Sequence, residues 1–236
     1  MQKITGLVRA AVDDYNMIEE GDTVAVGVSG GKDSLLLLKA LCELQRFYPK
    51  KFTLVAVTLD MRFENKDGDY SLIQKMCDEY NVRFVIKRTE LFEIIFNIRK
   101  ESNPCSLCAR MRRGILHDTA KENGCNKIAL GHHLDDAAET FLMNLFNESR
   151  IGCFSPVTYL SRKDITMIRP LIYLTEAQIE CAAKNLELPV IKSKCPADSN
   201  TQRESTKALI RQLSSDYGDV SKKIISALKK SNTDNW

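Results

Sequence analysis

Residues 23–38 constrain the fold more than any other part of the chain. They consist of a valine-rich run, a turn with two adjacent glycines and a run of four leucines. The pattern predicts a buried strand that ends at the turn and a helix that begins near Lys32. Gly30 and Gly31 would adopt torsions closed to other residues and bring backbone N–H groups close to an anion at the helix N-terminus. Residues 29–34 therefore predict a phosphate-binding turn, here called the cradle, whose candidate ligands are Ser29, Gly30, Gly31, Lys32, Asp33 and Ser34.

The spacing of residues within the cradle distinguishes between known kinds of phosphate-binding loop. A Walker A loop would need a glycine where Val26 stands and a hydroxyl residue where Asp33 stands. An ordinary glycine-rich turn between a strand and a helix is a second alternative. The run Ser-Gly-Gly-Lys-Asp-Ser instead resembles the PP-loop of the N-type ATP pyrophosphatases. That resemblance implies cleavage of ATP between the α- and β-phosphates to activate a carbonyl oxygen as its adenylate, with Lys32 and Asp33 as catalytic residues.

Length and composition favour an intracellular α/β protein. The 236 residues fit one large domain, or one domain with an appendage. We expect an N-terminal helix over 1–20, a PP-loop domain over 21–175 and a helical extension over 176–236. The chain has no run of about 18 apolar residues. Its first residues lead into an amphipathic segment instead of a signal peptide, so we expect a soluble cytoplasmic protein with no membrane partner.

Positive charge is concentrated in two segments. The chain carries +3 overall, whereas residues 99–113 and residues 202–230 each carry +4. Two basic patches on an acidic remainder indicate a polyanionic partner larger than ATP. Solvent-exposed helix faces alone would give the same pattern, and this alternative stays open.

Strand and helix patterns alternate along the chain, which predicts an open parallel sheet with helices on both faces. The expected strands are residues 23–28, 52–59, 82–87 and 127–130, with a short strand at 188–191. The expected helices are residues 4–18, 32–47, 70–80, 137–146, 176–186, 204–213 and 214–230, with a further helix starting at Pro104. Residues 91–104 could be a short helix or a docking segment, and residues 231–236 are expected to form a loose tail.

The carboxyl end of the second strand offers candidate adenine contacts. Ligands of open parallel sheets bind at the carboxyl ends of the strands. Leu59, Asp60 and Met61 stand at such an end and could contact the base or the ribose. An ordinary strand end followed by a loop is the alternative.

The fourth strand leads into a second polar stretch at the same edge of the sheet. Gly131 and His132 come first and would lie at the mouth of the nucleotide site. Asp135 and Asp136 follow, and either could hold Mg²⁺ on a triphosphate or position the accepting base. Helix capping is the alternative for each aspartate.

Eight cysteines in an intracellular chain indicate thiol or metal chemistry rather than a disulfide scaffold. Cys105 and Cys108 follow Pro104, which places them one turn apart on the same helix face, near its N-terminus. They could be a redox pair, half of a zinc site or two cysteines without a ligand. Cys195, with 86 residues between it and Cys108 and a proline after it, is the candidate third ligand. Of the others, Cys42, Cys77 and Cys181 are expected as apolar fillers in helices, and Cys125 and Cys153 lie in a turn and a loop without a cysteine partner.

Five segments, in this order, resemble the tRNA 2-thiocytidine synthetases over about residues 20–205. They are the cradle, residues 104–108 with 112–114, residues 130–136, residues 168–171, and Cys195 followed by residues 202–203. The cradle alone is typical of a superfamily, and the cysteines narrow the resemblance to iron–sulfur tRNA thiolases. The chain lacks the Cys/His pairs of an N-terminal zinc ribbon, which disfavours the related 2-thiouridine branch.

This resemblance implies a Rossmann-like fold of the adenine-nucleotide α-hydrolase type and a tRNA sulfurtransferase activity. ATP, with Mg²⁺, would adenylate the C2 oxygen of a cytidine in the anticodon loop at position 32. A [4Fe-4S] cluster on Cys105, Cys108 and Cys195 would carry sulfur on its open iron, and that sulfur would displace AMP. The implied partners are tRNA and a sulfur donor such as a cysteine desulfurase or free sulfide, and the resemblance allows a homodimer.

The same resemblance assigns roles to two arginines. Arg112, one turn past Cys108, would stabilise charge on the adenylated intermediate. Arg169 would face the phosphates or the substrate, with a structural salt bridge as the alternative. Two other hypotheses remain for the whole chain. One is lysidine synthetase, which shares the cradle and the His-His-Leu-Asp-Asp stretch but needs no cysteine triad, and the other is a non-catalytic nucleotide-binding module.

Overall fold

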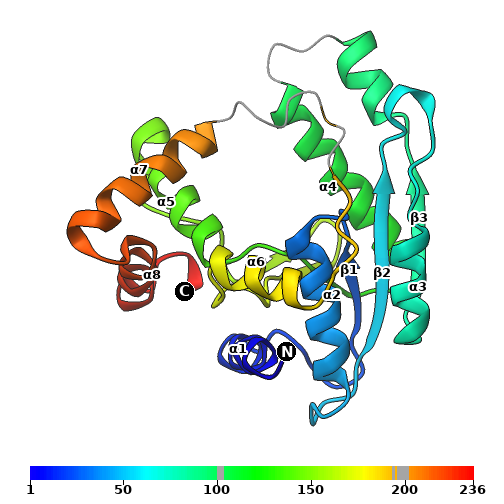
Figure 1. Cartoon of the computed structure of the whole chain (residues 1–236), viewed down its shortest axis with the longest axis horizontal. Coiled ribbons are helices and arrows are strands. Elements are labelled where there is room, and N and C mark those ends of the chain that lie inside the picture. Colours follow the sequence, from blue (N-terminus) through cyan, green and yellow to red (C-terminus); the bar gives the residue numbers. More distant parts are fainter. Residues whose placement is uncertain (100–103, 193–194, 196–201) are drawn as a thin grey trace.

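The computed structural model describes residues 1–99, 104–192, 195 and 202–236. Its described strands form one sheet in the order β3-β2-β1-β4-β6-β5 (Figure 1). The strands are β1 (Thr23–Gly27), β2 (Thr53–Asp60), β3 (Arg83–Arg88), β4 (Lys127–Ala129), β5 (Val157–Leu160) and β6 (Ile165–Ile168). β5 runs antiparallel to β6, and the other neighbouring pairs are parallel. The expected α/β sheet is confirmed, and the edge hairpin is an addition that the sequence patterns did not predict.

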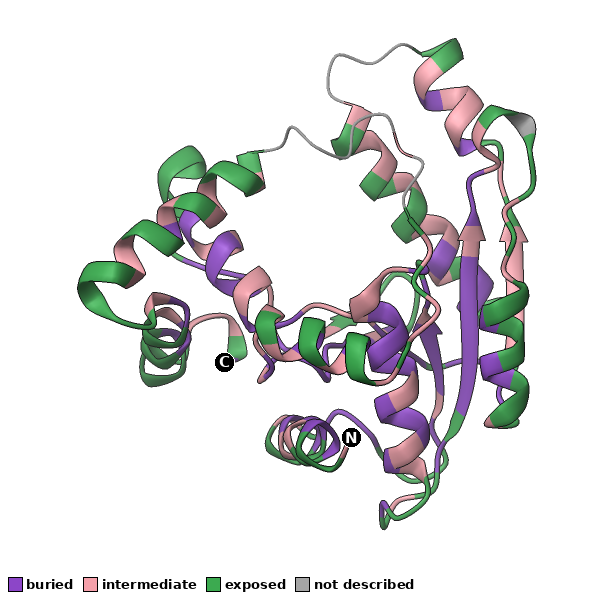
Figure 2. Ribbon diagram, viewed as in Figure 1, coloured by how far each residue is buried: buried purple, intermediate pink, exposed green. Residues whose placement is uncertain are grey.

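Helices cover both faces of this sheet. They are α1 (Gln2–Asp14), α2 (Lys32–Gln45), α3 (Ser71–Glu79), α4 (Pro104–Glu122), α5 (Leu134–Glu148), α6 (Glu176–Asn185), α7 (Gln202–Tyr217) and α8 (Val220–Ser231). Alternate residues of β1 face opposite cores, because successive side chains of a strand point to opposite faces. Val24 and Val26 belong to the core shared with α2, and Ala25 belongs to the core shared with α4. Figure 2 shows the central strands and α2 as the most continuously buried part of the ribbon.

The strand order places a crevice at the carboxyl end of β1. β1 lies between β2 and β4, so the chain proceeds to one side of β1 first and to the other side later. Such a reversal point opens a crevice between the two following connections, where ligands bind in open α/β sheets. The cradle stands there, between β1 and α2.

The carboxyl terminus is packed, so the expected loose tail at 231–236 is wrong. Trp236 is buried, and its indole Nε1 donates a hydrogen bond to the Phe154 carbonyl oxygen at 3.0 Å. Its ring also meets the ring of Tyr15 edge-on at 6.5 Å. A large aromatic side chain with a polar partner stabilises a chain end that sequence position alone assigned to solvent.

The expected strand at 188–191 is also absent, since these residues form an irregular segment. The backbone N–H of Ile191 donates to the carbonyl oxygen of Gly30 at 2.9 Å. A run of residues that favour strand structure therefore forms its hydrogen bond with the cradle instead of with the edge of the sheet. Residues 188–191 therefore contact the phosphate-binding turn.

Two helix boundaries differ from the expected ones. The single helix expected at 214–230 is divided, because Gly218 adopts a left-handed φ of +73° that ends α7. Asp219 then caps α8 by accepting a hydrogen bond from the Lys222 N–H at 3.0 Å. Within the ambiguous stretch 91–104, Glu93–Ile98 forms a short π-helix, and residues 100–103 lie outside the described residues.

The expected division into segments 1–20, 21–175 and 176–236 stays a prediction. Residues of α1, α2, α6 and α8 belong to one hydrophobic core. None of the described helices combines the length and the apolar composition that are needed to span a bilayer.

Candidate active site

The cradle is a left-handed turn held by its own serines. Gly30 has a φ of +85°, which side-chain-bearing residues rarely adopt. Gly31 has an ordinary φ of −75°, so the expectation of unusual torsions is confirmed at Gly30 and wrong at Gly31. The hydroxyl of Ser34 accepts from the Ser29 N–H at 3.1 Å and donates to the Gly31 carbonyl at 2.9 Å. The serines therefore brace the turn from inside.

Lys32 is held by two carboxylates. Its Nζ lies 3.4 Å from Asp33 Oδ1 and 3.3 Å from Glu176 Oε1 at the start of α6. Burial alone would lower the pKa of the Lys32 ammonium, but the charges of Asp33 and Glu176, with a hydrogen bond to Glu176, raise it above its ordinary value. Lys32 is therefore a fixed cation at the first position of α2.

A cavity of about 700 Å³ opens beside the cradle. Its walls come from β1, β2, α4, the β4–α5 turn, Arg169 and the start of α7. The candidate residues that line it are Ser29, Asp33, Ser34, Leu59, Arg112, Gly131, His132, Asp136 and Arg169. The candidates outside this lining are Gly30, Gly31, Lys32, Asp60, Met61, Asp135 and the three cysteines.

The β4–α5 turn packs directly on the cradle. A Cβ atom added to Gly131 would lie 3.2 Å from the backbone carbon of Asp33 and 3.2 Å from the backbone nitrogen of Ser34. Only glycine permits this approach without a shift of the main chain. Asp33 Oδ1, at the same place, is buried and accepts no hydrogen bond from the residues described, with Lys32 as its ion-pair partner. Asp33 Oδ1 is therefore a candidate ligand for a metal cation.

The two aspartates of the β4–α5 turn have different structural partners. Asp135 Oδ2 accepts from the backbone N–H of Glu176 at 2.7 Å, so it caps α6 rather than its own helix. Asp136 Oδ2 accepts from the His133 N–H at 3.0 Å in the capping box of α5. Its other oxygen lies 2.6 Å from Arg203 Nη1. Capping of its own helix is thus observed for Asp136 but not for Asp135, and a role in holding Mg²⁺ stays a prediction for both.

Arg169 is a buried cation with neutral partners. Its Nε donates to His132 Nδ1 at 3.3 Å, and its Nη1 donates to the Ser155 carbonyl at 2.5 Å and to Thr158 Oγ1 at 3.1 Å. No carboxylate forms an ion pair with it among the residues described, so the alternative of a structural salt bridge finds no partner there. Burial, followed by the charge of Arg169, lowers the pKa of His132 to about 4, which keeps that ring neutral.

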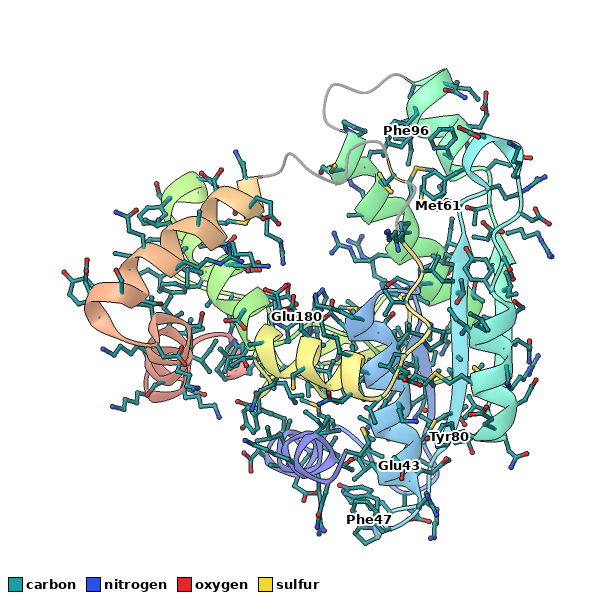
Figure 3. The ribbon with its side chains drawn as sticks, in the orientation of Figure 1. Glu43, Phe47, Met61, Tyr80, Phe96 and Glu180 are labelled. Carbon is teal, nitrogen blue, oxygen red and sulfur yellow. The ribbon has the colours of Figure 1, made fainter. Side chains whose placement is uncertain are left out.

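At the end of β2, the three adenine candidates diverge. Leu59 lines the cavity. The Asp60 carboxylate accepts from the backbone N–H groups of Arg62 and Gly68, both at 2.9 Å, and so braces the following loop. Met61 packs in a small core against Phe96 (Figure 3). Of the three, Leu59 is the one positioned to meet a base in the cavity.

Two residues with no predicted role belong to this site. Arg203 lines the cavity and pairs with Asp136, and its Nη1 also lies 3.4 Å from Glu139 Oε2. Glu139 is buried, and burial, partly offset by the charge of Arg203, raises its pKa to about 7. Arg203 lies in a segment that matched the family resemblance, but no role was assigned to it. Glu139 lies between apolar positions of α5, and an acidic side chain at such a position is the sequence feature that could have identified it.

Two of the three candidate metal ligands stand at the N-terminus of α4, and the next turn of that helix borders the cavity. Burial raises the pKa of Cys108, the charge of Arg112 lowers it, and the charges of Cys195 and Cys105 raise it further. The convergence of Cys195 with the pair as ligands of one metal centre stays a prediction. Among the described residues, no three Cys, His, Asp or Glu side chains are already arranged as a metal-binding group.

The other cysteines separate by burial. Cys42, Cys77, Cys125 and Cys153 are buried. Burial raises the pKa of the Cys42 and Cys153 thiols to about 12, which makes them inert fillers. Cys181 is exposed on α6, so its expected role as an apolar filler is wrong.

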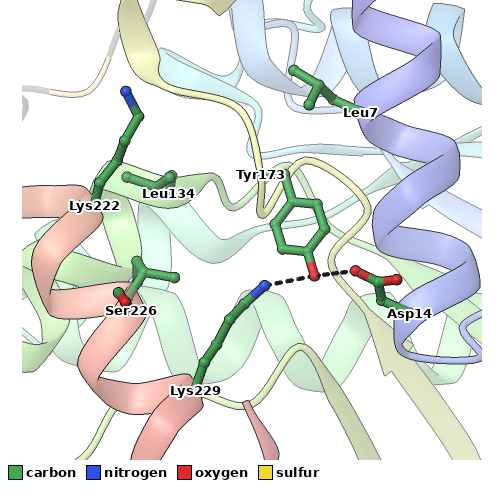
Figure 4. A pocket seen from close by; sticks show the side chains of 8 residues that line it. Leu7, Asp14, Leu134, Tyr173, Lys222, Ser226 and Lys229 are labelled. Atoms are coloured by element: carbon green, nitrogen blue, oxygen red, sulfur yellow. Dashed lines mark hydrogen bonds between the residues drawn. The ribbon is translucent and has the colours of Figure 1, made fainter.

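A second cavity, of about 350 Å³, lies between α1 and α8 (Figure 4). Lys229 Nζ lies 2.7 Å from the Tyr173 hydroxyl, which donates to Asp14 Oδ2 at 2.7 Å. None of the candidate site residues lines it. The chemistry-bearing residues therefore gather at the first cavity.

The chain was compared with known families and proteins. Residues 4–214 match the family model described as a PP-loop domain. The tRNA-cytidine(32) 2-sulfurtransferase of Syntrophotalea carbinolica is 40% identical over 230 residues, which cover 96% of this chain and 88% of that relative. The protein of the same name from Geobacter metallireducens is 39% identical over 96% of this chain and 89% of its own length.

Two solved structures also align with most of the chain, at lower sequence identity. The U34-tRNA thiolase NcsA from Methanococcus maripaludis, solved with its [4Fe-4S] cluster, aligns with a TM-score of 0.76 and 25% identity over 96% of this chain and 78% of its own. The NH3-dependent NAD synthetase of Campylobacter jejuni aligns with a TM-score of 0.52 and 18% identity over 97% of this chain and 91% of its own. At that identity the second likeness concerns the fold alone.

Proposed function

The chain belongs to the tRNA-cytidine 2-sulfurtransferases of the PP-loop family, and we propose that it uses ATP to replace the C2 oxygen of a tRNA cytidine, at position 32, by sulfur. A carbonyl oxygen leaves poorly until it is phosphorylated. In the proposed reaction, the C2 oxygen attacks the α-phosphorus of ATP and pyrophosphate departs. Sulfur then forms a bond to C2, and the C2–O bond breaks as AMP leaves with the oxygen.

The cradle binds and orients the nucleotide in this proposal. Backbone N–H groups at the start of α2 and the Lys32 ammonium receive phosphate oxygens. Leu59, which lines the cavity, offers an apolar contact for the base. Arg169 adds a buried positive charge that no carboxylate offsets among the described residues, so it is suited to phosphate or to the developing negative charge.

The oxygen atoms available for Mg²⁺ are unequal. Asp33 Oδ1 is buried and accepts no hydrogen bond in the described residues, and its ion-pair partner Lys32, at 3.4 Å, would turn to phosphate when the nucleotide binds, which fits a bound cation. Asp135 already caps α6 and Asp136 is paired with Arg203, so each would have to exchange a partner. We therefore propose Asp33 as the main protein ligand of Mg²⁺ and Asp136 as a secondary one.

The remaining candidate ligands are three cysteine thiols, with no oxygen or nitrogen ligand among them. Cys105, Cys108 and Cys195 fit an iron–sulfur cluster, because thiolates are the soft ligands that such clusters require. Held by three cysteines, a [4Fe-4S] cluster would supply one iron with no protein ligand as a soft site for sulfur. Arg112 lines the cavity and its charge also acts on Cys108, so it stands between the thiols and the nucleotide site. That position supports its proposed role in stabilising the adenylated base.

The observation that carries the proposal is the cavity in which the cradle, Arg169 and Arg112 of α4 meet, with Cys105 and Cys108 at the N-terminus of the same helix. The test separates the two halves of the site. Cys108→Ser, purified anaerobically, should lose most of its iron and retain ATP binding, whereas Lys32→Ala should do the reverse. Both should abolish 2-thiocytidine in tRNA, measured by mass spectrometry of nucleosides.

Cys181→Ser is the matched control, because this exposed thiol lies on α6, outside the cavity. It should keep iron, ATP binding and product formation. A full complement of iron in Cys108→Ser would overturn the ligand assignment. An active, metal-free wild-type protein would instead favour a lysidine synthetase.

The sulfur donor that we propose is free sulfide, or a cysteine desulfurase whose persulfide sulfur is reduced to sulfide by an external two-electron reductant. Reconstitution of the holoprotein with sulfide alone separates the two, because product should then form without a second protein. A homodimer and a cytoplasmic location are further parts of the proposal. Light scattering of the purified holoprotein checks the first, and cell fractionation checks the second.

A further inference from the structure

A chain of ion pairs leads from the cradle to α7. Lys32 Nζ lies 3.3 Å from Glu176 Oε1, and the other oxygen of the same carboxylate, Oε2, lies 2.5 Å from Lys207 Nζ. Glu176 is the first residue of α6, and Lys207 belongs to the second turn of α7. One carboxylate therefore bridges an ammonium group of the nucleotide-binding turn and an ammonium group of a helix near the other end of the chain.

The position of Glu176 is set by the start of its helix. Its backbone N–H donates to Asp135 Oδ2 at 2.7 Å, and Thr175 and Gln178 form a capping box around it. Burial alone would raise the pKa of the Glu176 carboxyl, but Lys207 and Lys32 together hold it below its ordinary value. Glu176 is thus an ionised acceptor at a fixed place beside Lys32.

Glu176 Oε1 and a phosphate oxygen are competitors for the same ammonium group. Both are anionic acceptors, and they repel each other at short range. We propose that Glu176 is a positioning residue that releases Lys32 to the triphosphate and is then balanced by Lys207 alone. This inference rests on the proposed function, because it requires ATP at the cradle.

The exchange links the nucleotide to α7. When Lys32 turns to phosphate, the Glu176–Lys207 pair becomes the only ion pair of that carboxylate, so α7 is held more firmly against the start of α6. α7 begins seven positions after Cys195 and also reaches Asp136 through Arg203. Occupation of the cradle would therefore act on the helix that follows the third thiol.

Two substitutions should change nucleotide affinity in opposite directions. Glu176→Gln removes the competing anion, so the full-length holoprotein should bind α,β-methylene ATP about three- to tenfold more tightly. Lys207→Gln leaves the carboxylate on Lys32 alone, so binding should weaken by about the same factor. Isothermal titration calorimetry measures both. A purely structural role would weaken binding in both variants.

Controls come from the same helix. Glu180→Gln and Lys184→Gln change exposed charges of α6 (Glu180 is labelled in Figure 3), and both should bind as the wild type does. The double variant Glu176→Gln/Lys207→Gln should bind like Glu176→Gln alone, because Lys207 acts through Glu176. Unchanged or weaker binding by Glu176→Gln would overturn the inference, as would additive effects in the double variant.

Failure of the proposed function has a different signature. Lys32→Ala should lose the analogue in every case, and wild-type-like binding by Lys32→Ala would contradict the function itself. Weak binding by Lys32→Ala together with unchanged binding by Glu176→Gln would overturn only the role of Glu176. Should Glu176→Gln fold poorly, the comparison of Lys207→Gln with Lys184→Gln still decides, since equal affinities would contradict the inference.

Discussion

The two walls of the cavity differ in how their charges are balanced. On the wall formed by α5 and α7, Arg203 is paired with Asp136 at 2.6 Å and with Glu139 at 3.4 Å. On the α4 wall, Arg112 and Arg113 line the same cavity, and neither forms an ion pair with a described carboxylate. One wall is electrically compensated, and the other presents uncompensated positive charge beside two thiols.

This difference separates positioning from chemistry. Paired charges in a low-dielectric setting hold a geometry, because removal of either partner leaves the other unsatisfied. Unpaired cations can stabilise negative charge that develops during a reaction. We therefore expect α4 variants to change turnover, and α5 and α7 variants to change binding and stability.

The largest effect is expected on the α4 wall. Arg112→Ala should lower the rate of 2-thiocytidine formation by about 100-fold, while ATP affinity and iron content change little, because the lost charge acts mainly on the adenylated base. Single-turnover kinetics with tRNA measure the rate. Lys121→Ala, an exposed change near the far end of the same helix, outside the cavity and the basic segment 99–113, should stay within a factor of about two. An equal loss in Arg203→Ala would break the contrast between the walls.

An intermediate effect is expected where α5 meets the cradle. Gly131→Ala places a Cβ 3.2 Å from backbone atoms of Asp33 and Ser34, so the turn must shift and ATP should bind about tenfold more weakly. Gly114→Ala is the control, because its added Cβ meets nothing within 4 Å in the middle of α4. It should stabilise the protein by about 1 kcal/mol in urea unfolding. Unchanged ATP affinity in Gly131→Ala would show that the close approach of the β4–α5 turn to the cradle does not determine nucleotide binding.

A change in stability, with no change in turnover or affinity, is expected at the buried carboxyl of the compensated wall. The pKa of Glu139 rises to about 7 from 4.5 on folding, so the unfolded chain ionises first as pH increases. Stability should therefore fall between about pH 4.5 and pH 7, by up to about 3 kcal/mol, and remain lower above pH 7. Glu139→Gln should remove this slope and be more stable than wild type at pH 8 by about 1–2 kcal/mol, as measured by urea unfolding.

Glu148→Gln, an exposed change near the end of the same helix, should retain the slope. A pH dependence identical in Glu139→Gln and wild type would mean that the pairing with Arg203 already keeps Glu139 ionised. The α5 and α7 wall would then be fully compensated, which sharpens the contrast with α4.

The sequence predicted what local patterns encode. The β1–cradle–α2 unit follows from hydrophobic runs interrupted by glycine, and the first turn of α4 follows from Pro104. The partners of the charged groups could not be predicted in this way. Glu176 is 144 positions from Lys32, and neither residue carries a local signal of the other.

The elements that the sequence did not predict were missed for the same reason, because they lack a local signal. Val157–Leu160 is a short edge strand with mixed burial, so it lacks a hydrophobic period. Trp236 is buried only because α1 and the loop at Phe154 supply its contacts. Family resemblance added the link between Cys195 and the distant pair, which spacing alone did not establish.

The bond between the Ile191 N–H and the Gly30 carbonyl oxygen joins the cradle to the segment that ends at Cys195 through main-chain atoms alone. The bond needs an amide hydrogen at position 191, and the Ile191 side chain, which packs against the core that contains α2, adds a second contact at the same place. Proline is the one standard amino acid without that hydrogen, so a single Ile191→Pro change would detach this segment from the cradle without altering any candidate ligand of ATP or metal.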